Sequence, residues 1–539
     1  MPVAFALRLG RWGVLGFSLA GFFATAVNAF GFYAIAGDTP AERASFGQSM
    51  ITLASQFVAL LPPPIRPDTV TGYIQWRGFN PLVIVFSVWA LASASGFARG
   101  DEEKGVVEAV LTVGVSRAQL IASRAVAFAA GLAIATAAAA LGLVAGAAYG
   151  HEAIGAAPLV EVCVMVAAVT LSSYAIALLI AQFVTGRAAT AAGGAVLLGL
   201  YLLNGLSRVY PWLSGWRWLS PFRYYDLSQP LPPGGYFDGR ALLMLLGITF
   251  VAGAAAAVAF QARDLGAPLW APALQPRTPS HEVTAAAWLR KPVIRGLYER
   301  RIGIVAWAAG LVALAVVFVS LTRTIVQVLL SVPALLPYFS FFVSRQVYPA
   351  VLGFTWFNVA QLLFAGFAIA YVAGWAAQDV DGRLEATLSQ PFSRAAVVVE
   401  RMAVLAAAAA VIAAAGGATL YVASHAQGID LNLGRLLAAC AMLVPFALLF
   451  GGAGALLSAW NPRAAVGLLG AFAFASYLDA ELGAIFKLPL WVQDLSAFAL
   501  FGAPLLAGVD WRSLTLMLLL AAVGLGGSIL AMQRRDVGA

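Results

Sequence analysis

The sequence predicts an all-α integral membrane protein made of two tandem repeats of six membrane-spanning helices. Of its 539 residues, 62% are hydrophobic and only 10% are charged. This apolar content is too large to be buried in the core of a water-soluble protein. Several apolar runs exceed about 18 residues, the length that crosses a bilayer. A charged segment also occurs twice, at residues 99–117 and 377–394, which we call the first and second islands. One spacing of 277 positions relates the identical residues of the two copies, which in the first copy are Gly105, Glu108, Ala109, Leu111, Ser116, Arg117 and Arg124.

Apolar runs of about 20 residues place six spans in each repeat. The first run, residues 12–36, is longer than the core of a signal peptide, which has about 7–15 residues, so we expect it to remain as the first span. In the first repeat, residues 1–265, the expected spans are 12–36, 80–98, 125–149, 158–184, 189–207 and 240–262. In the second repeat, residues 302–539, they are 302–321, 352–376, 402–424, 436–459, 464–480 and 513–533.

The distribution of lysine and arginine predicts the orientation. These residues gather in the N-terminus, the two islands, the connector at residues 266–301 and the C-terminus, so we expect these segments, and both chain ends, on the cytoplasmic side. The connector is rich in proline and basic residues, which is typical of a tether near anionic headgroups. An even number of spans per repeat inserts both repeats the same way up, related by a pseudo-two-fold axis along the membrane normal.

The chain lacks the residues of the common catalytic and metal sites. None of its three lysines, Lys104, Lys291 and Lys487, precedes a serine or threonine, so there is no Walker A sequence to hold nucleotide phosphates, and we expect no enzyme activity in this chain. The two cysteines lie in apolar runs and the three histidines are far apart, which predicts neither a disulfide nor a metal site. No basic cluster with interleaved aromatic residues indicates nucleic acid as a partner.

Each island predicts a short amphipathic helix that a turn separates from the next span. In the first island, Val106, Val107, Val110 and Leu111 recur at helical spacing, with Glu102, Glu103, Glu108 and Thr112 elsewhere on the circumference. Ser116 and Ser393 are expected to cap the helices that follow, and Gln119 completes a capping box in the first copy. Arg117 and Arg394 fall in the first turn of those helices, where the macrodipole does not favour a cation, so their partners are expected elsewhere.

Acidic residues followed by Gly-x-x-Glu-x-x-Leu-x-x-x-x-Ser-Arg, between the second and third spans of a six-span unit, resemble the permeases of ABC exporters of the ABC-2 class. The duplicated single-chain form is similar to actinobacterial-type permeases described as exporters of polyketide antibiotics and other drugs. The first copy departs from the family's usual proline with Gly114, whereas the second copy keeps it as Pro391.

The resemblance implies the ABC-2 exporter fold in a bacterial plasma membrane, with a coupling helix in each island. It also implies two copies of a separate ATPase subunit as partners, which would bind ATP and magnesium, so that this chain itself holds no cofactor. The residues implied to contact the ATPase are Glu102, Glu103, Gly105, Glu108, Ser116, Arg117, Asp381, Gly382, Glu385, Ser393 and Arg394.

A transport path is expected along the second, fifth, eighth and eleventh spans. Its candidate lining is aromatic or amide in character: Phe86, Trp89, Tyr201, Asn204, Phe357, Asn358, Gln361, Phe472 and Tyr477. Aromatic side chains in a span also serve ordinary helix packing, whereas amides at bilayer depth prefer a partner or a wet cavity. Such a lining fits a hydrophobic or amphipathic drug, a polyketide-like antibiotic or a lipid. The alternative function is a proton-coupled multidrug transporter with six-plus-six helices, which no centrally placed acidic residue supports.

Overall fold

The computed structural model of the chain is helical throughout the residues it describes, which are 2–56, 58, 61–184, 187–269, 291–331, 347–380, 383–389, 393–482, 489, 493 and 495–534. The chain divides after Pro279 into two compact units. Within the described residues the only strand-like feature is an isolated bridge between Gln229 and Tyr236. The predicted all-α class is therefore confirmed for this part of the chain.

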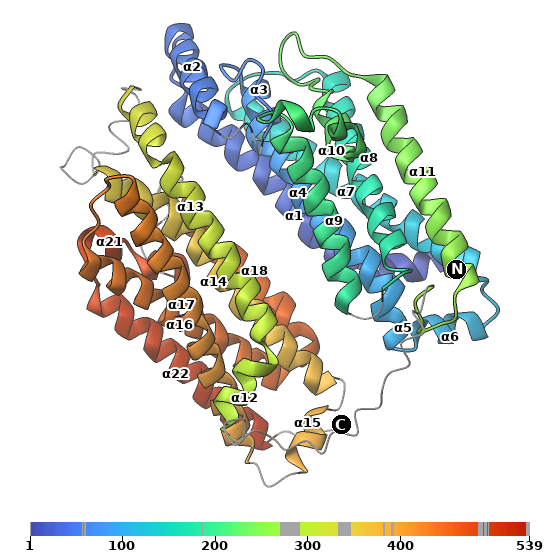
Figure 1. Cartoon of the computed structure of the whole chain (residues 1–539), viewed down its shortest axis with the longest axis vertical. Coiled ribbons are helices and arrows are strands. Elements are labelled where there is room, and N and C mark those ends of the chain that lie inside the picture. Colours follow the sequence, from blue (N-terminus) through green and yellow to red (C-terminus); the bar gives the residue numbers. More distant parts are fainter. Residues whose placement is uncertain are drawn as a thin grey trace. The chain divides into compact units, whose positions relative to one another are not determined.

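Unit 1 carries the first repeat (Figure 1). Its helices and helical turns are α1 (Pro2–Ile35), α2 (Pro40–Gln56), α3 (Val70–Ile74), η1 (Gln75–Phe79), α4 (Asn80–Ser95), η2 (Gly96–Gly100), α5 (Asp101–Glu103), α6 (Val106–Thr112), α7 (Arg117–Tyr149), α8 (Ala156–Ile180), α9 (Arg187–Leu206), η3 (Pro211–Leu213), η4 (Trp216–Leu219), α10 (Pro221–Asp226) and α11 (Gly239–Ala262).

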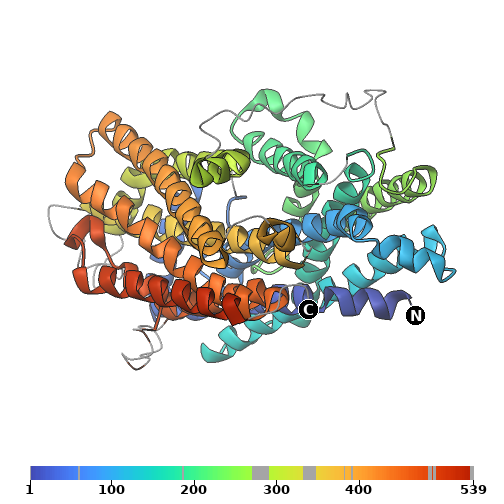
Figure 2. The same cartoon turned by 90° about the horizontal axis from the view of Figure 1, so that it is seen from below.

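Unit 2 carries the second repeat, and Figure 2 shows its red α22 running alongside the orange α17. Its helices are α12 (Pro292–Glu299), α13 (Arg301–Ser331), α14 (Val347–Val380), α15 (Arg383–Leu388), α16 (Arg394–Ala426), α17 (Leu433–Trp460), α18 (Pro462–Leu482), α20 (Ala497–Phe501), α21 (Pro504–Ala507) and α22 (Trp511–Arg534).

Eleven helices within the described residues are long and apolar enough to cross a membrane, so the chain is a multi-pass integral membrane protein. They coincide with eleven of the twelve predicted spans. The predicted span at 464–480 forms the apolar part of α18, the shorter helix Ala464–Ala480. The second span differs from its prediction because α3, η1, α4, η2 and α5 join into one run, Val70–Glu103.

Small residues allow the spans of each unit to pack closely. In unit 1, a Cβ added at Gly142 of α7 would lie 2.2 Å from the carbonyl oxygen of Phe22 in α1. In unit 2, a Cβ at Gly524 of α22 would lie 2.5 Å from the carbonyl carbon of Gly452 in α17. Each position therefore accepts only glycine without a shift of the backbone.

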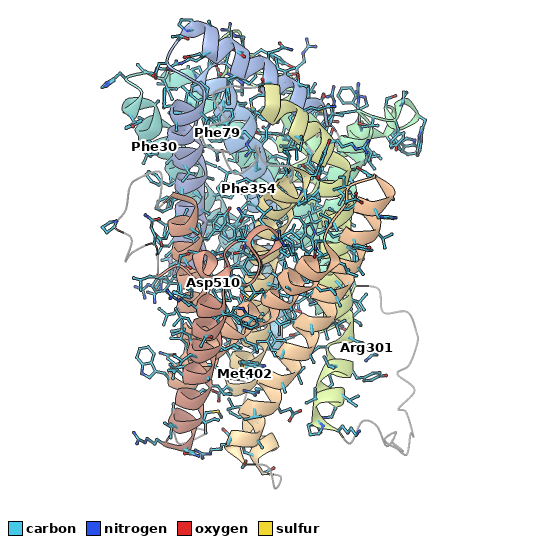
Figure 3. All side chains as sticks on the ribbon, turned by 90° about the vertical axis from the view of Figure 1, so that its left-hand side faces the viewer. Phe30, Phe79, Arg301, Phe354, Met402 and Asp510 are labelled. Atoms are coloured by element: carbon cyan, nitrogen blue, oxygen red, sulfur yellow. The ribbon has the colours of Figure 1, made fainter. Side chains whose placement is uncertain are left out.

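Each unit has an end that carries its island, which we call the island end, and an opposite far end. In unit 1, α5 and α6 lie at the island end, while α2 and α10 lie at the far end (Figure 1). In unit 2, Figure 3 labels Arg301 at the start of α13 and Met402 near the start of α16, both at the island end. At the far end of unit 2, the Asn432 side chain caps the start of α17 and the Asp510 side chain caps the start of α22.

Candidate functional site

The first island contains two helical segments separated by a break. The run that contains the second span continues through α5 to Glu103, and Lys104 and Gly105 then break it, with Gly105 at a φ of +69°. The short helix is α6 alone, and its Val107 is buried in the core of unit 1. The expectation that Glu102 and Glu103 share a helix with Glu108 is therefore wrong, because the left-handed Gly105 separates them.

The turn after α6 confirms the predicted cap. Gly114 adopts a φ of +87°, and the Ser116 hydroxyl then accepts a hydrogen bond from the Gln119 amide at 3.2 Å. The Gln119 side-chain oxygen accepts a hydrogen bond from the Ser116 amide at 3.1 Å, which completes the capping box at the start of α7. The equivalent Ser393 caps α16 by accepting from the Ala396 amide at 3.1 Å.

Glu102 lies inside unit 1, where two arginines surround its carboxylate. Arg263 Nη2 pairs with one oxygen, and Arg263 Nη1 and Arg99 Nη1 lie 3.1 Å and 3.3 Å from the other. The side chains of Arg99, Glu102 and Arg263 are 4%, 3% and 0% exposed. A carboxylate enclosed in this way is not accessible to a partner protein at the surface of unit 1.

The same two arginines bind the ends of neighbouring helices. Arg99 Nε donates to the Ala181 carbonyl after α8 at 2.7 Å, and Arg263 Nε donates to the Gln182 side-chain oxygen at 2.8 Å. Both guanidinium groups also donate to the Ala267 carbonyl at 3.2 Å. We call Arg99, Glu102, Gln182 and Arg263 the ion cluster, which joins α5 to the ends of α8 and α11.

Arg117 and Arg394 make the same contact in the two units, and their partners do lie outside their own helices, as predicted. Arg117 Nη1 donates to the carbonyls of Phe260 and Arg263 at the end of α11, at 3.1 Å and 2.7 Å. Arg394 Nη1 donates to the carbonyls of Met532 and Gln533 at the end of α22. A cation at a helix C-terminus satisfies unpaired carbonyls and complements the macrodipole.

A second arginine also makes equivalent contacts in the two units. Arg124 Nη2 lies 2.5 Å from Asp101 Oδ2, and at the equivalent positions Arg401 Nη2 donates to Gln378 Oε1 at 3.0 Å. The contact therefore recurs with an ion pair in unit 1 and with a neutral acceptor in unit 2.

The surface of the first island is formed by other residues of the predicted set. Glu103, Gly105 and Ser116 are exposed, and Glu108 is half-buried, with its Oε2 atom enclosed and without a hydrogen-bond partner. Val113, in the turn after α6, is 77% exposed. The first island thus presents an apolar tip beside exposed charged groups.

The second island is described in part. Asp381, Gly382 and Pro391 lie outside the described residues, and α15 forms the helix between them. Leu384 is buried like its counterpart Val107, whereas Glu385 is exposed. The two short helices therefore bury an aliphatic side chain at equivalent positions.

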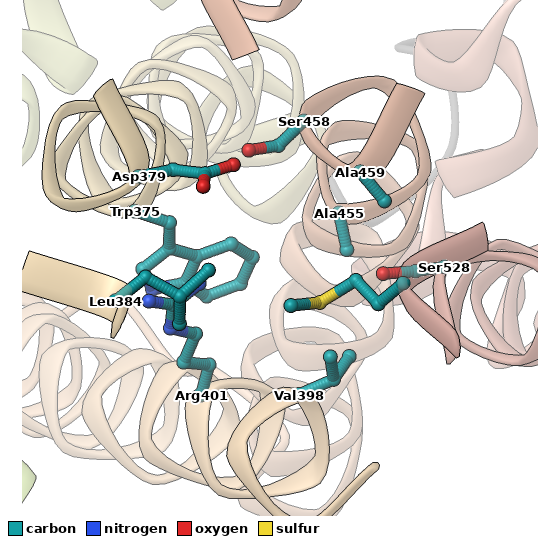
Figure 4. Close-up of a pocket in the computed structure, with 10 residues that line it drawn as sticks. Trp375, Asp379, Leu384, Val398, Arg401, Ala455, Ser458, Ala459 and Ser528 are labelled. Carbon is teal, nitrogen blue, oxygen red and sulfur yellow. The ribbon is translucent and has the colours of Figure 1, made fainter. Parts of the chain in front are cut away.

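A small pocket of about 20 Å³, room for about one water molecule, lies beside α15 (Figure 4). Asp379 and Ser458 face each other across it, and the Arg401 guanidinium lies over the Trp375 ring at 5.9 Å from the ring centre. At the spacing of 277 positions, Asp379 is the counterpart of Glu102 and Ala376 is the counterpart of Arg99. At these two positions the side chains of unit 2 are shorter than those of the ion cluster. Arg535, the counterpart of Arg263, lies outside the described residues.

The predicted path residues differ in how deeply they are buried within their own units. Phe86, Trp89 and Phe357 are buried in the cores of their own units, where Trp89 stacks on Phe17 at 4.9 Å and Phe357 packs on Trp356 at 4.6 Å. These three side chains therefore serve helix packing. Gln361 is buried, Asn358 is half-buried and Phe472 is exposed.

Tyr201 and Tyr477 occupy matching places at the far ends. Tyr201 meets Phe222 of α10 edge-on at 5.3 Å, and Tyr477 meets Phe498 of α20 edge-on at the same distance. The short helices that follow the fifth span in each repeat are thus held by the same aromatic pair.

Charges reinforce this far-end contact in unit 1. Asn204 Nδ2 donates to Asp226 Oδ2 at 2.6 Å, and Arg208 pairs with the same carboxylate. Arg208 also donates to the Val58 carbonyl at 2.8 Å. Burial raises the pKa of Asp226, and the nearby charge of Arg208 opposes that rise. In unit 2, Ser496 Oγ at the start of α20 donates to the Ser476 carbonyl of α18 at 2.6 Å.

Among the described residues no group of three His, Cys, Asp or Glu side chains could hold a metal ion. The residues that sequence reasoning missed are Arg99, Gln182, Arg208 and Arg263, since basic residues near span ends were interpreted as markers of orientation. One available signal was the repeated Gln-x-Arg-Asp that closes each repeat and contains Arg263.

The comparison with protein families concerns the second repeat. Residues 289–532 match the family model described as "Multidrug efflux system permease Rv1217c, C-terminal domain". The match runs from just before α12 to the end of α22 and so covers the six helices of that repeat. No curated protein matches the chain. Unit 2 is thus similar to a domain of a multidrug efflux permease.

Proposed function

We propose that this chain is the membrane permease of an ATP-driven exporter, powered by two copies of a separate ATPase that dock on the two islands. The observation that carries the proposal is the repeated island itself: a short helix with one buried aliphatic residue, followed by a serine cap and an arginine bound to the end of the sixth helix. An arrangement that occurs twice in one chain is suited to binding two identical partner subunits. The match of residues 289–532 to an efflux permease domain supports the export direction.

The proposed docking surface contains the exposed part of each island. In the first it comprises the exposed Glu103 and Val113, together with the half-buried Glu108, and in the second the exposed Glu385. In this proposal the island ends face the cytoplasm, and closure of the ATPase dimer on ATP displaces α6 and α15. Because α6 lies between α5 and α7, its displacement reaches the second and third spans directly. The substrate would be a hydrophobic or amphipathic drug, antibiotic or lipid that follows the second and fifth spans of each repeat.

The competing function, proton-coupled transport, would need an acidic residue that takes up a proton within a span. In the described spans the acidic side chains lie toward the helix ends, as Glu161 does in α8 and Asp479 in α18. Both oxygens of Asp479 are enclosed without a hydrogen-bond partner. Asp479→Asn therefore serves as the test of the alternative: proton coupling predicts loss of transport, and the ATP-driven proposal predicts that transport is kept.

The docking proposal is tested by the double variant Glu108→Ala/Glu385→Ala, purified with its ATPase. We expect ATP hydrolysis to continue while export falls about tenfold, because couplings between distant sites are worth about 1–3 kcal/mol. Asp430→Ala removes an exposed carboxylate from the far end of unit 2 and is the matched control. Export by the double variant at the level of that control would contradict the assignment of the islands.

A further inference from the structure

A stretch between the fifth and sixth spans of the first repeat exposes large apolar side chains at the far end of unit 1. Residues 207–238 connect α9 to α11, and because both helices are long enough to cross a membrane, this stretch lies at a membrane–water interface. Trp212 of η3 is 74% exposed, and Trp216 and Leu219 of η4 are each 61% exposed. Since tryptophan is enriched at the level of the lipid headgroups, these side chains suit contact with lipid better than contact with bulk water.

Two arginines share one tryptophan ring in the same stretch. The guanidinium carbons of Arg217 and Arg223 lie 5.4 Å and 5.1 Å from the ring centre of Trp218, where the aromatic ring attracts a cation. The buried Tyr224 of α10 supports this tryptophan, because its hydroxyl donates to the Trp218 carbonyl at 2.9 Å and the two ring centres are 6.0 Å apart. The two cations are therefore held against a fixed support at the far end (Figure 1).

Neither arginine forms a hydrogen bond or an ion pair through its side chain with the described residues. Both side chains are half-buried, and the Nε atom of each is enclosed without a hydrogen-bond partner. Asp226 attracts Arg223, but its carboxylate is already paired with Arg208. Burial, and then the like charge of Arg217, lower the pKa of Arg223. An anion bound beside the two guanidinium groups would offset both their burial and their repulsion.

We propose that Arg217, Trp218 and Arg223 form a binding site for the phosphate group of an anionic phospholipid. Guanidinium groups bind phosphate oxygens through paired hydrogen bonds, which gives such contacts both strength and a defined geometry. The exposed apolar side chains of η3 and η4 would contact the acyl chains of the same lipid. A free phosphate ion has no apolar part for these side chains to contact, so the surroundings of the site favour a lipid.

The charge of the site selects among lipids. Two cations without an anionic partner favour a headgroup with net negative charge over a zwitterionic one, whose own ammonium group offsets its phosphate. A bound headgroup would also support the fifth span, because α10 carries Arg223 and contacts α9 through Tyr201 and Phe222. The site is independent of what drives transport.

Thermal unfolding of the detergent-purified full chain, measured with increasing phosphatidylglycerol, tests the site. We expect this lipid to raise the unfolding temperature by several degrees, as a ligand of the folded state does, and phosphatidylcholine to have less effect. Arg217→Gln/Arg223→Gln should unfold at about the native temperature without lipid and bind phosphatidylglycerol about tenfold more weakly. Arg217→Lys/Arg223→Lys, which keeps both charges and loses the planar groups, should bind with intermediate affinity.

Arg240→Gln is the matched control, because it removes an exposed arginine at the start of α11, at the same far end. It should leave the affinity for phosphatidylglycerol within about twofold of the native value. Equal losses in Arg240→Gln and the double glutamine variant would indicate a general attraction between charges and overturn the site. Stabilisation by sn-glycerol 3-phosphate equal to that by phosphatidylglycerol would overturn the assignment to a lipid.

A second measurement places the site in a membrane. Leu219→Cys is labelled with bimane in a chain that also carries Cys163→Ala and Cys440→Ala, and the protein is reconstituted in phosphatidylcholine vesicles. A small fraction of phosphatidylglycerol with a nitroxide in its acyl chain should quench the label more than the same fraction of nitroxide-labelled phosphatidylcholine. Arg217→Gln/Arg223→Gln should abolish that difference. Equal quenching by the two lipids before the arginines are replaced, or quenching by neither, would contradict the proposal.

Discussion

The island ends of the two units share one connection and differ in another. In both, an arginine at the start of the third span of the repeat binds carbonyls at the end of the sixth, as Arg117 and Arg394 do. Unit 1 also has a buried ion cluster centred on Glu102, and the described residues around its counterpart Asp379 in unit 2 line a small pocket. At the far ends, an arginine–aspartate pair supports α10 in unit 1, whereas Arg435 donates to the Leu506 carbonyl of α21 in unit 2. Both copies therefore use arginines at both ends, with partners that differ between the described parts of the two units.

The largest expected effect comes from Glu102→Ala, which leaves Arg99 and Arg263 buried without their anion. We expect unit 1 to lose about 4 kcal/mol of stability. Thermal unfolding of the detergent-purified variant, followed by size-exclusion chromatography, measures the loss. A loss as small as that of an ordinary surface substitution, about 0.5 kcal/mol, would show that the ion cluster does not hold the island end of unit 1 together.

Arg208→Ala tests the far ends and should cost about 3 kcal/mol at neutral pH, since it leaves Asp226 buried without its cation. Ser496→Ala, in unit 2, should cost about 1 kcal/mol. Burial already raises the pKa of Asp226, and loss of Arg208 raises it further. Because the folded variant then binds a proton more tightly than the unfolded chain does, its stability should recover as the pH falls through that raised pKa. A deficit that stays constant between pH 8 and pH 5 would contradict this account.

The smallest expected difference concerns the connection that the units share. Arg117→Ala and Arg394→Ala each remove charge-assisted bonds to carbonyls at a helix end, and each should cost about 2 kcal/mol. Equal shifts in unfolding temperature would confirm that this contact is common to both repeats. A much larger shift for Arg117→Ala would indicate that the ion cluster depends on it, since Arg117 binds the carbonyl of Arg263.

Much of the fold could be predicted because long apolar runs and local capping signals are local properties of the sequence. The spans, the capping box at Ser116 and the external partners of Arg117 all follow from spacing and helix electrostatics. The division of the first island could not be predicted, because it depends on a single backbone angle at Gly105. The sequence correctly predicts a short helix here, but the predicted helix is longer than α6.

The ion cluster illustrates why site residues are harder to predict than spans. Glu102 and Arg263 are 161 positions apart, and a basic residue near a span end is equally compatible with a marker of orientation and with a buried partner. Aromatic residues in spans presented the same ambiguity, since Trp89 and Phe357 pack within their units while Tyr201 and Tyr477 hold the short far-end helices. Only the contacts in the three-dimensional structure distinguish these roles.

Export by the chain reconstituted in lipid vesicles with its copurified ATPase tests the central claim most directly. If separate ATPase subunits drive both islands, a hydrophobic fluorescent drug should leave its compartment only with ATP and magnesium. Vanadate should stop that movement and a protonophore should leave it unchanged. Transport that continues under vanadate and collapses with the protonophore would contradict the account and identify the chain as a proton-driven transporter.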